Sequence, residues 1–436
     1  HRLTTYSRIN LKKTIVFSLS LIINATMFAH EAKYCGFDEV MNQIDKVNPG
    51  FKASADHILN IAKLHGSINK KNDIIFQIPT VFHIVYNTEA QNLPDYVIES
   101  QIDVLNANFR RFNENATETR EEFLPFAADA QIEFFLATED PTGNPSSGIT
   151  HNYTSESGFP YISIWDILTG NITLDNVKSS STGGVDAWDT SKYLNIWVCN
   201  IEDSFLGQVL GFAYPPTNIN EVLENVDLDT VPDWPTEGFT QNQDLQGVVL
   251  HYPIVGSNNP QNGDDGISGN EMGQACVHEV GHYLGLRHIW GDPIGGSGCS
   301  VDDGISDTPN QNEASQFTCN YNLNSCTDSP TNYPDMVENY MDYSNDACMN
   351  IFTTNQSIVM RSVLELARPG LIEGQDEEDN CTNGDVNSDD IINIQDVILV
   401  VNIILGANID INCSDYNEDG IINIQDIILI VSEILN

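Results

Sequence analysis

The chain has 436 residues, of which 41% are hydrophobic, and this is enough for about two or three domains with sizeable cores. It carries 62 acidic residues against 18 basic ones, a net charge of −44. A surface this acidic repels nucleic acids and anionic membranes and excludes both as partners. The acidity fits either solubility in a salty or extracellular medium or carboxylates that bind calcium.

Residues 1–29 have the layout of a secretion signal. Lys12 and Lys13 precede the apolar stretch TIVFSLSLIINATMFA, which ends at a cleavage site after Ala29. A membrane anchor is the alternative reading, but the stretch is short for a membrane span. We therefore expect an extracellular protein, free or attached to a surface, with no stable membrane span in its mature form. Its cysteines are then expected to form disulfides.

Residues 30–73 are expected to form a pro-segment. Their composition is polar, and apolar residues recur at helical spacing in FDEVMNQIDKV and ADHILNIAKLH. The segment ends at NKKND, a basic pair that a protease can cut when it is exposed.

A sheet domain is expected over residues 74–372. Strand-type segments alternate there with helical ones, which predicts an α/β or α+β domain. Residues 291–350 are rich in Cys and Gly, and we expect little helix in them. The strand candidates are 74–86, 130–138, 193–201 and 247–256, and the helix candidate is 95–112.

The stretch HEVGHYLGLRH (278–288) has the spacing of a catalytic zinc site. On a helix, His278 and His282 lie on one face, where both imidazoles reach one ion. Gly285 allows a sharp turn that brings His288 back as the third ligand. The fourth position on zinc is then open for a water molecule, which Glu279 activates for attack on a carbonyl. An amphipathic helix with surface histidines is the alternative, and the extended motif makes it a poor one.

The extended motif resembles that of the metzincin metalloproteases, and the surrounding sequence is similar to the pappalysin family, including its ulilysin-like bacterial members. The stretch ENYMDYSNDACMNIFTTNQ (338–356) matches the Met-turn region of that family. The resemblance implies that Met341 forms the hydrophobic base under the zinc and that Tyr343 stabilises the oxyanion of the reaction. Ordinary core packing is the alternative for both residues. The implied fold is a twisted mixed sheet, a zinc-binding helix and an irregular, disulfide-bonded lower subdomain.

The segment DDGISDTPN (302–310) is also similar to a part of that family. The resemblance implies a structural calcium ion with Asp303, Asp307 and Thr308 as ligands, since calcium prefers oxygen donors in irregular loops. A plain Asp-rich turn explains the same residues without an ion.

Four cysteines lie in the region that is expected to have little helix, and spacing alone leaves three pairings open among them. The resemblance implies the pairs Cys299–Cys326 and Cys319–Cys348. Cys199 and Cys276 have no partner by pattern. They either pair with each other or are buried thiols, and we favour buried thiols.

After an acidic linker (373–380), residues 381–436 contain a repeat with EF-hand spacing: DVNSDDIINIQD (385–396) and DYNEDGIINIQD (415–426). Each loop precedes an apolar run, and two helices packed together would bury these runs. The repeat resembles the dockerin module, a small all-α calcium-binding domain whose family role is to bind cohesin domains. Two Ca²⁺ ions and a Cys381–Cys413 bridge are expected. The expected ligands are Asp385, Asn387, Asp389, Ile391, Asn393 and Asp396 in the first loop, and Asp415, Asn417, Asp419, Ile421, Asn423 and Asp426 in the second.

Cys35 is the cysteine without a counterpart among the nine in the chain. It lies in the expected pro-segment, and a thiolate is a good fourth ligand for a zinc ion held by three histidines. Cys35-Gly36 resembles the pair that related proteases use to keep the precursor latent. An incidental or intermolecularly paired thiol is the alternative.

Together these features predict a secreted zinc endopeptidase that acts on proteins or peptides, is made as a latent precursor and carries a calcium-dependent docking module. The alternative is a non-catalytic, calcium-dependent scaffold protein with a vestigial zinc site. The intact zinc ligands and Glu279 argue against it.

Overall fold

The computed structural model describes residues 33–47, 49–68, 74–162, 172–203, 208–217, 243–263, 269–291, 298–372, 384–387, 391–404, 413–417 and 422–435. The expected secretion signal (1–29) and acidic linker (373–380) lie outside these residues. Among the described helices, none combines the length and the apolar character that crossing a membrane requires.

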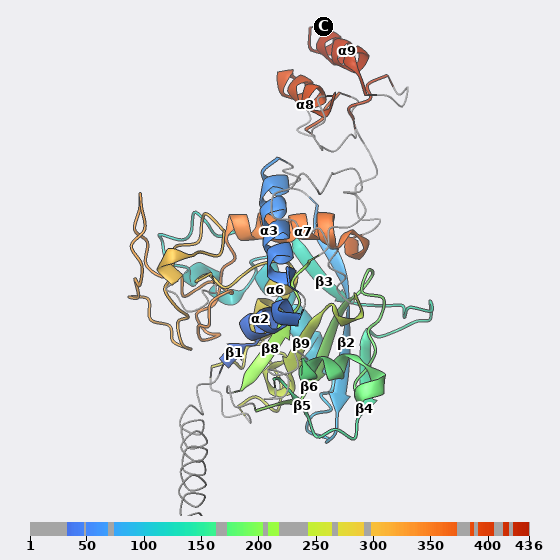
Figure 1. Cartoon of the computed structure of the whole chain (residues 1–436), viewed down its shortest axis with the longest axis vertical. Helices are drawn as coiled ribbons and strands as arrows, with labels where there is room; N and C mark the ends of the chain where they lie inside the picture. Colours follow the sequence, from blue (N-terminus) through green and yellow to red (C-terminus); the bar gives the residue numbers. More distant parts are fainter. Residues whose placement is uncertain are drawn as a thin grey trace, which may run out of the picture.

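A mixed sheet forms the frame of the molecule (Figure 1). Its order is β1-β8-β9-β6-β2-β3, and β4 also pairs with β2. All strand pairs in this sheet are parallel except β8 with β9, so β1 and β8 run antiparallel to the other strands. The strands are β1 (Lys33–Cys35), β2 (Phe76–Tyr86), β3 (Ile132–Leu136), β4 (Ile149–Tyr153), β6 (Leu194–Cys199), β8 (Val209–Ala213) and β9 (Val248–His251), and a separate parallel pair joins β5 (Phe159–Pro160) to β7 (Ile201–Glu202).

The long strand β2 holds the sheet together because it pairs with β3, β4 and β6. Its β-branched and aromatic residues suit a strand that is buried on both faces. The four predicted strands and the predicted helix are confirmed by β2, β3, β6, β9 and α4. The sequence did not reveal β8, the strand beside which the site forms.

Helices cover the sheet and carry the motif residues. α4 (Asp95–Phe109) contacts both β3 and α6 (Gln274–Tyr283), the helix that carries the first two histidines. α7 (Thr354–Ala367) begins with a capping box, in which Thr353 and Gln356 satisfy each other's backbone N–H groups.

Residues 33–68 pack onto this frame. β1 adds to the sheet edge beside β8, with Cys35 opposite Gly211. α2 (Phe37–Val47) follows, and α3 (Phe51–Ile68) packs across α7 (Figure 1). Val40, Phe51 and Ala62 are fully buried, so the segment shares the core of the sheet domain.

The lower region contains no α-helix among its described residues 298–350, as expected. Two disulfides hold it, Cys299–Cys326 and Cys319–Cys348, which are the pairs that the resemblance implied. Cys199 and Cys276 are free and buried, in agreement with the favoured reading.

Near the C-terminus the structure contains two helices, α8 (Ile394–Ile404) and α9 (Ile424–Ile434), which contact each other. Val397, Val400 and Ile430 form their buried core. The expectation that packing would bury the apolar runs is wrong for much of their length: Ile398 is 54% exposed and Ile428 is 61% exposed. Each helix has only one packed face, because two short helices cannot enclose each other.

Candidate metal centre

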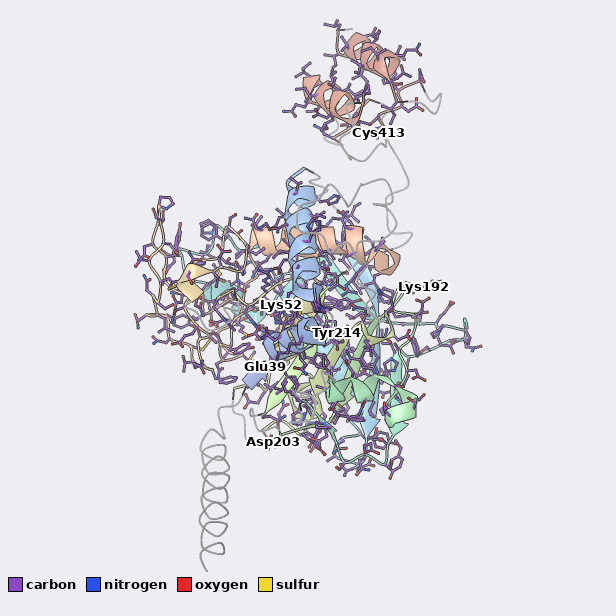
Figure 2. The ribbon with its side chains drawn as sticks, viewed as in Figure 1. Glu39, Lys52, Lys192, Asp203, Tyr214 and Cys413 are labelled. Atoms are coloured by element: carbon purple, nitrogen blue, oxygen red, sulfur yellow. A yellow bond between two sulfur atoms is a disulfide. The ribbon has the colours of Figure 1, made fainter. Side chains whose placement is uncertain are left out.

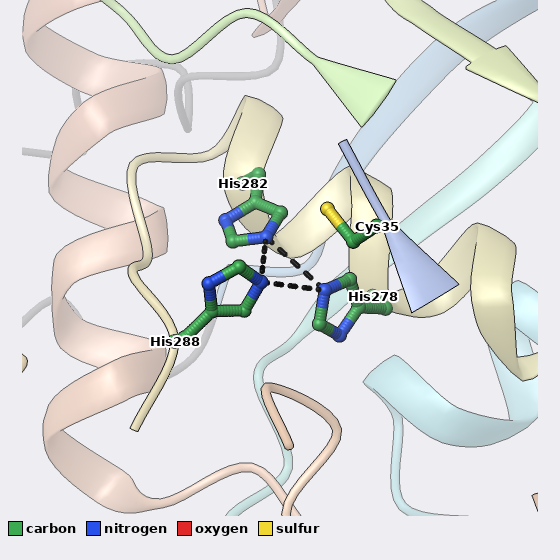
Figure 3. Close-up of side chains that lie close together, drawn as sticks. All are labelled: Cys35, His278, His282 and His288. Atoms are coloured by element: carbon green, nitrogen blue, oxygen red, sulfur yellow. Dashed lines mark hydrogen bonds between the residues drawn. The ribbon is translucent and has the colours of Figure 1, made fainter. Parts of the chain in front are cut away.

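Three histidines meet beneath the sheet edge with their Nε2 atoms facing one another (Figure 3). The Nε2 atom of His282 lies 3.1 Å from that of His278 and 3.1 Å from that of His288, and the third distance is 3.3 Å. Tetrahedral zinc with Zn–N bonds of about 2.0–2.1 Å requires nitrogen atoms roughly 3.3 Å apart. All three side chains are fully buried. The nitrogens therefore stand at zinc-ligand spacing.

Backbone carbonyls orient two of these rings. The Nδ1 atom of His278 donates to the Tyr340 carbonyl at 2.7 Å, and that of His282 donates to the Leu286 carbonyl at 2.8 Å. Because Nδ1 carries the proton, the Nε2 lone pair faces the site. Burial lowers the pKa of both histidines well below the usual value, which favours the neutral ring that a metal needs.

Side chains from two different segments fix the rings from outside. Trp290 stacks on His288 with centroids 4.3 Å apart. Phe37, the first residue of α2, stacks on His282 at 3.9 Å. Asp38 Oδ1 faces His288 Nδ1 at 3.4 Å. Thus the segment before residue 73 contributes two contacts to the ligand shell.

Cys35 completes a group of four ligand atoms. Its Sγ and one nitrogen from each of the three histidines all lie within 4.8 Å of one another (Figure 3). The thiol is buried and accepts a hydrogen bond from the Phe37 backbone N–H at 3.3 Å. Burial raises the pKa of the thiol well above its usual value. Three imidazoles and one sulfur form a donor set that suits zinc, which also favours the thiolate.

The backbone around Cys35 is fixed on both sides. Gly36 donates its N–H to the Gly211 carbonyl at 2.9 Å, and its own carbonyl accepts from the Tyr161 hydroxyl. A Cβ at residue 36 would lie 2.4 Å from the Tyr161 ring, so only glycine fits there. The Tyr343 hydroxyl donates to the Cys35 carbonyl at 3.2 Å, and the Tyr343 ring lies 4.9 Å from that of His288.

Glu279 is the acidic residue of the site. Its side chain is fully buried, and the polar group that lies beside its carboxylate is the Cys35 thiol. Burial raises the pKa of the carboxyl to about 8. A buried carboxylate with only a thiol beside it is costly, which indicates a place for a proton or a water molecule.

Met341 lies directly under the zinc-site helix. A Cβ built at Gly281, between the two helical histidines, would lie 2.5 Å from Met341 Sδ. Met341 is fully buried, and its backbone N–H donates to the Asn339 side chain at 2.9 Å. The close approach depends on the glycine, so the two residues form one packing unit.

The expected calcium ligands of the lower region point to different partners. Asp303 accepts hydrogen bonds from the Thr308 hydroxyl at 2.9 and 3.0 Å. Asp307 instead accepts from Thr353 at 2.6 Å and from the Asn355 backbone N–H at 2.9 Å, at the start of α7. Protein donors therefore engage both carboxylates, and the calcium site stays a prediction.

In the C-terminal repeat, the aspartate at the last position of each loop points inward. Asp396 and Asp426 are fully buried, and each accepts backbone N–H donors of its own loop, including Asn393 and Asn423 at 2.8 Å. Asp385 is buried as well. Within the described residues, neither loop forms a group of three acidic ligands. Cys413 is disulfide-bonded. Cys381, Asp389, Asp419 and Ile421 lie outside the described residues; Asn387, Ile391, Asp415 and Asn417 lie within them.

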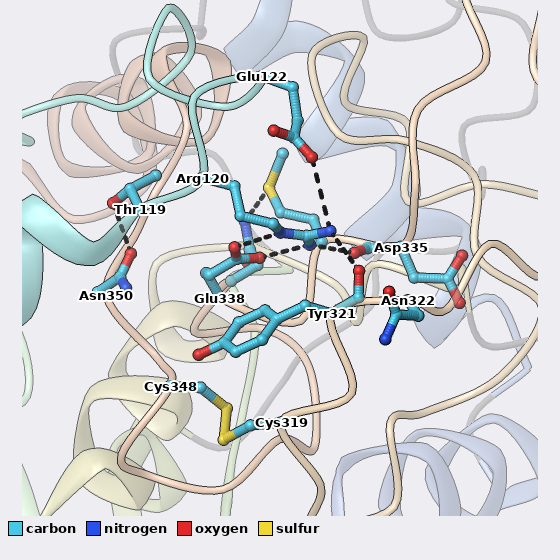
Figure 4. Close-up of polar contacts among 12 residues, drawn as sticks. Thr119, Arg120, Glu122, Cys319, Tyr321, Asn322, Asp335, Glu338, Cys348 and Asn350 are labelled. Carbon is cyan, nitrogen blue, oxygen red and sulfur yellow. Dashed lines mark hydrogen bonds and ion pairs between the residues drawn. A yellow bond between two sulfur atoms is a disulfide. The ribbon is translucent and has the colours of Figure 1, made fainter.

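An ion pair beside the Met-turn was not foreseen (Figure 4). Arg120 bonds both carboxylate oxygens of the fully buried Glu338, at 2.5 and 2.7 Å. It also donates to the Asp335 and Tyr321 carbonyls, and the rings of Phe123 and Tyr321 flank its guanidinium. The pair ties the segment before β3 to the chain that leads into Met341. No motif marks Arg120, because its partners are mostly carbonyls far away in the sequence.

Comparison with known proteins also shows similarity to zinc metalloproteases. Residues 252–365, which contain the zinc motif, match the Peptidase_M43 family model, described as pregnancy-associated plasma protein-A. Extracellular metalloprotease 1 of Coccidioides posadasii is 40% identical over 67% of this chain and 79% of its own length. A promirolysin mutant of Tannerella forsythia is 37% identical with a TM-score of 0.61, covering 78% of this chain and 97% of that one. Mature mirolysin of the same organism in complex with a cleaved peptide is 39% identical with a TM-score of 0.54, covering 69% of this chain and 97% of that one.

Proposed function

Because this chain belongs to the pappalysin family of zinc metalloendopeptidases, we propose that it is a secreted peptidase, made as a latent precursor in which Cys35 occupies the zinc site. The observation that carries this proposal is the group of four ligand atoms, three from the motif and one from the segment before residue 73.

His278, His282 and His288 would hold the ion. Zinc, when bound, polarises the scissile carbonyl and lowers the pKa of its water to about 7. Glu279 then takes a proton from the attacking water onto a carboxylate oxygen and passes it to the leaving amine. The Tyr343 hydroxyl, now bonded to the Cys35 carbonyl, would donate to the developing oxyanion.

The latent state is supported by the way in which residues 33–68 occupy the site. β1 covers the edge of β8, the Cys35 Sγ lies within 4.8 Å of a nitrogen of each of the three histidines, and Phe37 stacks on His282. An extended substrate would use the same edge, as extended peptides commonly do on exposed strands. The mirolysin structures support the same division, since the precursor covers more of this chain than the mature form does.

Replacing the thiol tests latency. The uncut precursor with Cys35→Ala is expected to cleave a fluorogenic peptide or itself, because water then gains the fourth position. The cut enzyme should not change, since residue 35 has left with the pro-segment. Cys199→Ala is the matched control, because Cys199 is also buried and free but does not belong to the ligand group. An uncut Cys35→Ala precursor as silent as the parent would refute the switch and favour steric blockage alone.

We propose further that residues 381–436 form a dockerin-like module that binds two calcium ions and attaches the enzyme to a cohesin-like or cell-surface partner. The inward Asp396 and Asp426 support this assignment, since both occupy the last position of an EF-hand-type loop. The structural calcium of the lower region, through Asp303, Asp307 and Thr308, remains part of the same proposal.

A further inference from the structure

Arg287 directly precedes the zinc ligand His288 and forms an ion pair with Asp56 of α3. The Arg287 side chain is 27% exposed, and that of Asp56 is 52% exposed. The partner carboxylate therefore belongs to the segment that leaves on maturation, whereas the guanidinium stays with the enzyme.

Both residues line a cavity of about 170 Å³ between the pro-segment and the catalytic domain. Phe37 and Leu59 line it from the pro-segment side, and Pro216 and Leu286 line it from the enzyme side. Lys52, labelled in Figure 2, also lines the cavity. Tyr214, labelled there too, directly precedes Pro215 and Pro216, which line the cavity just after β8. Removal of residues 30–73 would take away the pro-segment side of this cavity and expose Leu286 and Arg287, which lie next to the zinc ligand His288 in the sequence.

We propose that Arg287 forms a substrate subsite for an acidic side chain, and that Asp56 occupies this subsite in the precursor. The inference rests on the proposed function, because it requires a pro-segment that leaves. A guanidinium pairs well with a carboxylate and is always charged, so Asp56 and a substrate Asp or Glu offer it the same chemistry. The chain has 18 basic residues against 62 acidic ones. A cation placed beside a zinc ligand therefore offsets a general repulsion of acidic substrates.

The test uses the mature, zinc-loaded enzyme and sets of peptides that are identical except for Glu or Gln at one position on either side of the cleaved bond. At one position the parent is expected to show a kcat/KM about fivefold higher for Glu than for Gln, and this ratio should fall in high salt. Arg287→Gln should bring the ratio close to one. Arg287→Lys should keep part of the preference, and Arg287→Glu should favour Lys over Gln at the same position.

Zinc content is measured for each variant, and the Glu-to-Gln ratio is read within one variant, so a general loss of activity does not imitate the effect. Equal kcat/KM for Glu and Gln at every position of the parent, or an unchanged ratio in Arg287→Gln, would overturn the subsite while leaving the peptidase intact. A parent that cuts none of the peptides would instead overturn the proposed function and the subsite with it.

Discussion

The histidines of the metal centre and the expected ligands of the C-terminal repeat both lie close together in the sequence, but their surroundings in the structure differ. At the metal centre, helix α6, the turn at Gly285 and the Met-turn hold three nitrogens at zinc spacing within the large core. In the repeat, Asp396 and Asp426 bond to N–H groups of their own loops, over a core of only a few residues. We therefore expect the metal centre, embedded in a large core, to be organised before an ion arrives, whereas the calcium site proposed for the small repeat would depend on the ion for its order.

The largest expected effect concerns the organised site. Glu279→Ala should keep zinc, because the three histidines are oriented by carbonyls and packing that this change does not touch. It should lower kcat/KM by at least about 10²–10⁴-fold, since the proton acceptor is lost. Zinc content by elemental analysis and peptide cleavage by the matured enzyme measure the two parts. Near-parent cleavage would disprove the assigned mechanism, and loss of zinc would show that the site is less preorganised than its geometry indicates.

The sequence predicted the metal centre well because its spacing is local. His278, His282 and His288 lie within eleven residues, so a helix and one glycine turn determine their meeting. Arg120 and Glu338 could not be found in this way, because their pairing depends on how distant segments fold together. Strand β8 has a glycine, Gly211, at its centre and no alternation of apolar and polar residues, so its sequence lacks the usual strand pattern, although it forms the edge that Cys35 covers.

Calcium removal should produce an effect of intermediate size that is confined to the repeat. In EGTA, with the zinc content measured to confirm that the metal centre stays loaded, α8 and α9 should lose hydrogen-exchange protection, because the loop acids then repel one another. Protection of α6 and α4 should stay the same. The control is Asp396→Asn with Asp426→Asn, which should weaken protection even with calcium present. Full protection of α8 and α9 in EGTA would refute the calcium assignment. The repeat would then be ordered without a bound ion, as we expect for the metal centre.

The smallest expected effect sharpens the description of the repeat itself. Ile428 and Ile430 are two residues apart on α9, but Ile428 is 61% exposed and Ile430 is fully buried. Ile430→Ala should destabilise α9 by about 2–4 kcal/mol, because it opens a cavity in a core of few residues. Ile428→Ser should change the stability by about 0.5 kcal/mol or less, since the side chain already faces water. Hydrogen exchange of α9 amides in the full chain measures both. If Ile428→Ser lowered the stability of α9 as much as Ile430→Ala does, the face of α9 that carries Ile428 would be covered in solution. A partner or a second copy of the chain bound there would have this effect.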